Sequence, residues 1–181
     1  DFRADGVTMG QKGSALKLAA AKKVKVSARV AAYLPEQQDK TGMTLSERQQ
    51  GSPYWHIEKA RIGTTRTVPV ELLVNGKPIA REVIEADGKL RKVSFEVPIE
   101  YSSWIAVRVL PSSHTNPIFV TVGNKPIRAS KKSAEWCRAA VDQCWKMKES
   151  QIREAERPAA KAAYDQARAY YDKAIAEAAG E

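Results

Sequence analysis

The side chains best suited to acid–base, metal or thiol chemistry are few, since the chain has only two histidines and two cysteines. His56 and His114 belong to no H-x-H, H-E-x-x-H or spaced Cys/His pattern, so the sequence offers no zinc signature. Ser112 and Ser113 precede His114, but adjacent residues rarely align as nucleophile and base, and no G-x-S-x-G elbow is present. The residues therefore predict no catalytic residue, no metal ligand and no cofactor-binding residue in this chain.

His114 stands among residues that favour turns. Two serines precede it, and Thr115, Asn116 and Pro117 follow it. Pro117 biases Asn116 towards an extended conformation before the next apolar segment. We therefore predict a hydrogen-bonded turn histidine, with a ligand contact as the alternative.

Cys137 and Cys144 are the only cysteines, and both lie in a segment with helical periodicity. Seven residues at about 1.5 Å each place their Cα atoms about 10 Å apart on one face. A disulfide needs Cα atoms within about 7 Å. We predict two free thiols that help to form a helical core.

Aromatic residues could provide stacking surfaces for sugars, with Tyr54, Trp55, Tyr101 and Trp104 as the available side chains. Trp55 and Trp104 also continue faces with a period of two, which favours packing in the core. We select four residues as candidates for ligand or interdomain contacts: Trp55, His56, Trp104 and His114.

These side chains must be positioned by two regions of different periodicity. From residue 15 to about residue 128, apolar and polar residues mostly alternate, which is typical of half-buried strands. In "KVKVSARV", Val24, Val26, Ala28 and Val30 share one face. Asn75-Gly76 and Asp87-Gly88 are hairpin signals that predict tight turns between paired strands, and Gly123-Asn124 is expected to precede a last strand, "KPIRA". Seven to nine short strands predict an immunoglobulin-like antiparallel β-sandwich over residues 1–128, in a mainly β protein.

The segment from Pro35 to Pro53 lacks both periods and is polar and rich in glutamine. A connection of this length in a compact domain is usually functional or conformationally variable. We interpret residues 35–53 as a surface loop, with contact to a neighbouring domain as the alternative.

Residues 129–181 have a helical period. Ser130 or Ser133 is a candidate N-cap, and Pro158 suits the first turn of a second helix. The apolar residues Trp136, Cys137, Ala140, Val141, Cys144 and Trp145 form one stripe, and Tyr164, Ala167, Tyr171 and Ile175 form another. We predict a C-terminal α-helical hairpin that packs on the sandwich or on a missing domain, because isolated helices of this length are marginal in water.

Charge is concentrated in the first region. The formal net charge is +9, and residues 1–128 hold 20 basic and 12 acidic residues. A polyanion such as an acidic glycan is therefore an alternative partner, whereas specific nucleic-acid binding is not expected because RRM, KH and helix-turn-helix signatures are missing. No apolar run predicts a membrane span. The first residues do not resemble a signal peptide, and the chain lacks an initiator Met, so we interpret it as a piece of a longer protein or a processed product.

Several longer phrases carry a family resemblance: "PYWHIEKARIG", "VPVELLVNGKPIA", "SSWIAVRVLPSSHTNPIFVTVGNKPIRASKKSAEWC" and "AAYDQARAYYDKAI". Together they resemble the C-terminal region of CehA/McbA-type metallohydrolases of the PHP superfamily. The version they most resemble is the large, exported type of planctomycete-like bacteria. The resemblance covers nearly all of the chain and is strongest from Ser102 to Cys137.

The resemblance implies a parent enzyme that hydrolyses ester or phosphoester-type bonds with a metal-activated water. In that family the metal site begins with an H-x-H motif in a domain that precedes this region, and no residue here matches it. The chain is therefore expected to be a non-catalytic accessory domain that stabilises the catalytic domain or shapes its cleft. A divalent metal is implied only for the missing catalytic domain, and export to the periplasm or beyond is implied by the resemblance alone.

Overall fold

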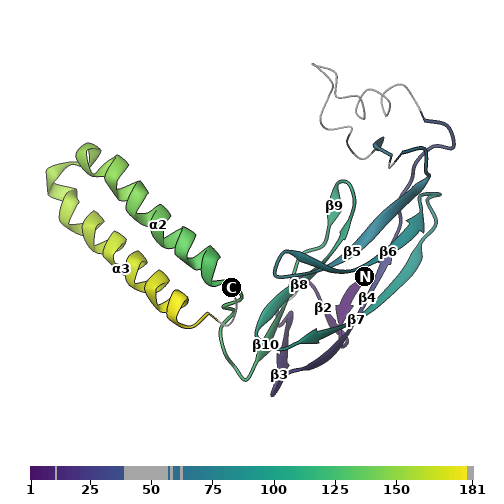
Figure 1. Ribbon diagram of the computed structural model, residues 1–181, viewed down its shortest axis with the longest axis horizontal. Coiled ribbons are helices and arrows are strands. Elements are labelled where there is room, and N and C mark those ends of the chain that lie inside the picture. Colours follow the sequence, from purple (N-terminus) through teal and green to yellow (C-terminus); the bar gives the residue numbers. More distant parts are fainter. Residues whose placement is uncertain (11, 39–56, 58, 62, 179–181) are drawn as a thin grey trace. The chain divides into compact units, whose positions relative to one another are not determined.

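The computed structural model describes residues 1–10, 12–38, 57, 59–61 and 63–178. The chain divides into two compact units, residues 1–125 and residues 126–181. Strands make up the first unit and a pair of helices makes up the second (Figure 1). The protein is mainly β and ends in a helical hairpin, as the sequence predicts.

The first unit is a sandwich of two sheets. Sheet A has the order β2-β1-β4-β7 and comprises β1 (Phe2–Ala4), β2 (Val7–Thr8), β4 (Lys22–Val30) and β7 (Arg91–Ile99). Sheet B has the order β3-β10-β8-β5-β6 and comprises β3 (Ala15–Leu18), β5 (Thr67–Val74), β6 (Lys77–Glu85), β8 (Ser103–Val109) and β10 (Ile118–Val122), while β9 (Ser113–His114) pairs with β8. Every pair is antiparallel except β3 with β10.

The core lies between the two sheets. The alternating valines of β4 face inward and are buried, together with Phe95 of β7 and Leu72 of β5. Polar residues between them face outward, because successive side chains of a strand point to opposite faces. The period of two therefore placed the core of this sandwich correctly.

The Asn75-Gly76 turn joins β5 to β6, as predicted. Both residues have positive φ, 51° and 84°, which suits the tight turn that the Asn-Gly pair favours. The Asn75 side chain also bonds β8: its Nδ2 donates to Ser103 Oγ at 3.0 Å, and its Oδ1 accepts from Trp104 N at 3.0 Å. The turn is thereby fixed to the neighbouring strand.

Two local expectations were wrong. Asp87-Gly88 does not close a hairpin, because β6 and β7 belong to different sheets and the turn carries the chain from sheet B to sheet A. "KPIRA" after Gly123-Asn124 is not a strand. The two edges of β10 are already paired with β8 and β3, and Pro126 has no N–H for a further ladder.

The second unit contains α2 (Lys131–Lys148) and α3 (Arg157–Ala176), joined through the 3₁₀ turns η2 (Glu149–Gln151) and η3 (Glu154–Glu156). Ser130 is the N-cap of α2, and its side chain accepts a bond from Ser133 N at 3.1 Å. Pro158 lies in the first turn of α3, where its missing N–H costs nothing. In the described part of the chain, neither helix is apolar enough over sufficient length to cross a membrane.

Candidate functional site

The four candidate contact residues are not gathered into one site by the described structure. Trp55 and His56 lie outside the described residues, as do residues 39–53 of the predicted loop. His114 is exposed on β9, and its Nδ1 lies 3.1 Å from Thr115 O. Trp104 is half-buried on β8, with its ring over the Asn75-Gly76 turn. Since Arg108 pairs with His114, Trp104 and His114 are separated by about four residues of strand, roughly 13 Å.

The described residues also contain no group of three or more His, Cys, Asp or Glu side chains arranged to hold a metal ion. Three other features of the described residues could form a site: the polar network between β6 and β7, the outer face of sheet B and the helical hairpin.

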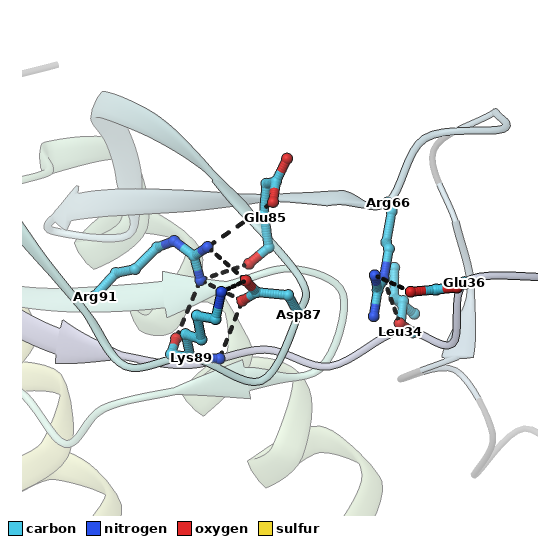
Figure 2. A network of polar contacts seen from close by, with 7 residues as sticks. All are labelled: Leu34, Glu36, Arg66, Glu85, Asp87, Lys89 and Arg91. Carbon is cyan, nitrogen blue, oxygen red and sulfur yellow. Dashed lines mark hydrogen bonds and ion pairs between the residues drawn. The ribbon is translucent and has the colours of Figure 1, made fainter.

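The polar network consists of hydrogen bonds within the turn between β6 and β7. Arg91 donates to both carboxylate oxygens of Asp87, at 2.6 and 3.0 Å, and Lys89 N donates to Oδ1 at 3.0 Å (Figure 2). These bonds hold the pKa of Asp87 well below its ordinary value, with the Arg91 hydrogen bonds as the main cause. Asp87 also bridges Tyr33 in the backbone ladder, so the network joins the end of sheet A to the chain that leads into residues 35–53.

Two arginines hold the chain on either side of that predicted loop. Arg66 Nε donates to Leu34 O at 2.8 Å, and its guanidinium lies 3.6 Å from Glu36 (Figure 2). Arg61 donates to Pro35 O and, at 3.3 Å, to Thr65 O. The sequence analysis missed both arginines because bonds to backbone carbonyls 26 and 32 residues away leave no local pattern.

The outer face of sheet B is partly apolar. Pro69, Glu71 and Leu73 point away from the core along β5 yet are buried, and Glu71 is 8% exposed and bonded by Arg108 at 2.5 and 3.0 Å. Around this buried centre, Phe119 and Val83 remain 48% and 59% exposed. A strand with apolar residues on both faces is typical of a sheet that is covered on both sides.

The hairpin is held together on one side by ion pairs. Arg138 bonds Asp172 at 2.9 Å, and Arg168 bonds Asp142 at 2.7 Å and Asp165 at 2.6 Å. Hydrogen bonds from Arg168 and Arg138 lower the pKa of Asp142. Because these pairs are surface-exposed, each contributes little to stability. The Arg138–Asp172 and Arg168–Asp142 pairs join α2 to α3 and help to set the register of the two helices.

The other side of the hairpin is an apolar groove. Residues two positions apart point in nearly opposite directions on an α-helix, so Trp136 and Ala140 lie away from Arg138 and Asp142. The groove encloses about 430 Å³ and is lined by Trp136, Cys137, Ala140, Val141, Cys144, Ala163, Tyr164, Ala167 and Tyr171. Trp136 is 73% exposed, and Ala174 is the only buried residue of the described α2 and α3.

Two cysteine–tyrosine contacts form the floor of this groove. Cys144 Sγ lies 3.2 Å from Tyr164 Oη, and Trp145 packs on Tyr164 with ring centroids 5.0 Å apart. The hydrogen bond with Cys144 raises the pKa of Tyr164, and the electrostatic interaction with Cys137 raises the pKa of Tyr171. Both cysteines are free thiols, as predicted, and both are half-buried.

The helical stripes predicted from the sequence contain all of these groove residues except Ala163. A comparison with protein-family models, one with curated proteins and one with solved structures each find no match to this chain.

Proposed function

We propose that this chain is a non-catalytic accessory domain of a metal-dependent hydrolase, and that its helical hairpin docks on the catalytic domain of the same parent chain. The observation that carries the docking role is the apolar groove with Trp136 at 73% exposure. The class of partner comes from the resemblance to CehA/McbA-type metallohydrolases. Export of the parent enzyme is part of the same proposal and is supported by this resemblance alone.

The energetics of the hairpin favour a covering surface. Helices of 18 and 20 residues gain most of their stability from packing an amphipathic face. Here ion pairs join the two helices on one side, and the apolar groove lies on the other side. Covering the exposed part of Trp136 alone contributes about 3 kcal/mol at roughly 25 cal/mol per Å². An apolar partner surface would therefore stabilise the hairpin and the complex together.

In this proposal the divalent metal and the hydrolytic water belong to the catalytic domain, and the described residues supply no ligand to either. In the same proposal, residues 35–53 have a second role, which is to shape the substrate cleft. Arg61 and Arg66 support that role because they hold Pro35 and Leu34 where the predicted loop leaves the sandwich.

The test mixes this chain with the separately produced catalytic domain of its parent protein and measures the complex by calorimetry. We expect a 1:1 complex and a raised melting temperature of the catalytic domain. Trp136→Glu places a charge in the groove and should weaken the complex at least tenfold. Leu90→Glu, the same kind of change at an exposed apolar residue of the sandwich, is the matched control and should leave the affinity unchanged.

The absence of a complex would contradict the proposal, as would equal affinity for the wild-type chain and Trp136→Glu. A separate assay covers activity. The chain alone, with Zn²⁺ or Mn²⁺ and a panel of ester and phosphoester substrates, should show no turnover above background. Reproducible turnover that His56→Ala or His114→Ala abolishes would replace this proposal with a catalytic one.

A further inference from the structure

The outer face of sheet A carries cationic side chains from several strands. The valines of β4 are buried, so alternation turns Lys23, Lys25 and Arg29 to the outside. Lys92 of β7 and Arg3 of β1 are exposed on the same face by the same alternation. Five cationic side chains from three adjacent strands thus share one surface.

The register brings two of these cations directly together. Arg29 is the cross-strand partner of Lys92 in the β4–β7 ladder. Like charges directly opposite each other destabilise a sheet, and among the described residues neither side chain has an ion-pair partner. By contrast, Arg3 bonds Asp1 at 2.9 Å and Lys23 lies 3.8 Å from Glu96. The Arg29–Lys92 pair is therefore an uncompensated positive centre.

Hydroxyl groups separate this centre from Lys25 along β4. Ser27 of β4 is opposite Ser94 of β7, and Arg3 of β1 is opposite Ser27 on the other side. Residues of one strand face recur about every 6.8 Å, so Lys25 lies roughly 13 Å from Arg29 along β4. The face therefore presents cations at two levels with hydroxyl donors between them.

The carboxylates near this face are bonded to groups other than the Arg29 and Lys92 side chains. Asp5 bonds Lys22 at 2.7 Å, and Lys25 N donates to Asp5 Oδ1 at 2.9 Å. Glu82 of β6 accepts a bond from Ser94 N at 3.2 Å, which satisfies an N–H on the outer edge of β7. Glu96 is opposite Lys25. Asp1 lies beside Arg29, since Arg29 N donates to Asp1 O at 3.2 Å, and its carboxylate bonds Arg3 at 2.9 Å. None of these interactions neutralises Arg29 or Lys92.

We propose that the outer face of sheet A binds an extended acidic polysaccharide, sulfated or rich in uronate, that runs along β4 and β7. Its anionic groups would pair with Arg29 and Lys92 at one level and with Lys25 at the next. Its sugar hydroxyls would bond Ser27 and Ser94. Among the described residues, this face carries no aromatic side chain for stacking on the bases of a single strand, and it offers no helix or ribbon for a duplex groove. The proposal does not depend on the hydrolase partner.

The experiment measures binding of the whole chain to heparin, used as a sulfated probe, by calorimetry at several salt concentrations. Arg29→Glu combined with Lys92→Glu lowers the formal net charge from +9 by four. Lys131→Glu combined with Lys132→Glu lowers it equally and alters the start of α2 instead. We expect the first variant to bind at least tenfold more weakly and with a salt slope reduced by about two. The control variant should bind within about twofold of the wild type.

Equal losses in the two double variants would overturn the proposal, because net charge alone would then explain binding. Tighter binding to a single-stranded or duplex DNA of similar charge than to heparin would also overturn it, as would no binding of the wild type at 0.15 M salt. Arg29→Gln combined with Lys92→Gln keeps the test decisive if the glutamate variant does not fold. It should again lose affinity, with circular dichroism showing an intact sandwich.

Discussion

Arg91 binds the Asp87 carboxylate through both of its Nη atoms, with Nη1 2.6 Å from Oδ1 and Nη2 3.0 Å from Oδ2. The pair closes the turn that carries the chain from sheet B to sheet A. Bidentate arginine–carboxylate pairs are among the stronger charge-assisted bonds in proteins. Asp87 is only 15% exposed and Arg91 28%, so solvent screens this pair less than the pairs of the hairpin.

This pair makes stability depend on pH on the acid side. Arg91 holds the pKa of Asp87 in the folded state well below 3.8, so its contribution to stability is present above the unfolded pKa and is lost as pH falls towards the folded one. The free energy of unfolding of the sandwich should therefore fall between about pH 5 and pH 2. Asp87→Asn should lower stability at pH 7 and flatten this dependence. Urea unfolding at several pH values measures both effects.

Glu100→Gln is the matched control for the pH experiment. Glu100 lies in the same unit and has no ion pair among the described residues. Its replacement should leave the acid-side dependence unchanged. An equally steep dependence in Asp87→Asn would show that other carboxylates cause it.

Asn75 should contribute more to stability than its position in a turn suggests. Its side chain bonds Ser103 Oγ and Trp104 N, and its φ of 51° is unfavourable for alanine. Asn75→Ala should therefore lower the free energy of unfolding by about 2–3 kcal/mol. Asn124→Ala tests the backbone contribution alone, because Asn124 has a φ of 58° and no side-chain bond among the described residues. Equal losses in the two variants, measured by urea unfolding, would contradict the role given to the bonds.

Ser130 should stabilise the hairpin as the N-cap of α2. Ser130→Ala removes the acceptor for Ser133 N and should cost about 1 kcal/mol. Ser133→Ala keeps the backbone donor and should cost less. Helical circular dichroism as a function of temperature gives the comparison, and a larger loss for Ser133→Ala would contradict the assigned cap.

The sequence predicted the strands of the sandwich because burial on one face imposes a period of two, as in β4. It predicted the hairpin because Ser130 and Pro158 mark helix starts by local chemistry. The assignment of Asp87-Gly88 to a hairpin failed because local turn chemistry does not say which sheet receives the next strand. The expected strand after Gly123 failed because β3, from the other end of the chain, occupies the edge of β10.

The candidate sites differ in how far they could be predicted from the sequence. The stripes of Cys137, Cys144 and Tyr164 could be found, but the helical period does not reveal whether a face is covered. The Arg29–Lys92 centre depends on the register of two strands more than 60 residues apart, and one residue of slip would move Lys92 to the other face. Cross-strand charge is therefore a property of the fold and not of the local pattern.

The intact mass of the native protein, with peptides mapped upstream of Asp1, tests the central claim most directly. The accessory-domain account predicts a longer chain that carries an H-x-H motif and the other ligands of a metallohydrolase domain before the sandwich. A native product that begins at or near Asp1 and co-purifies with no hydrolase would contradict it.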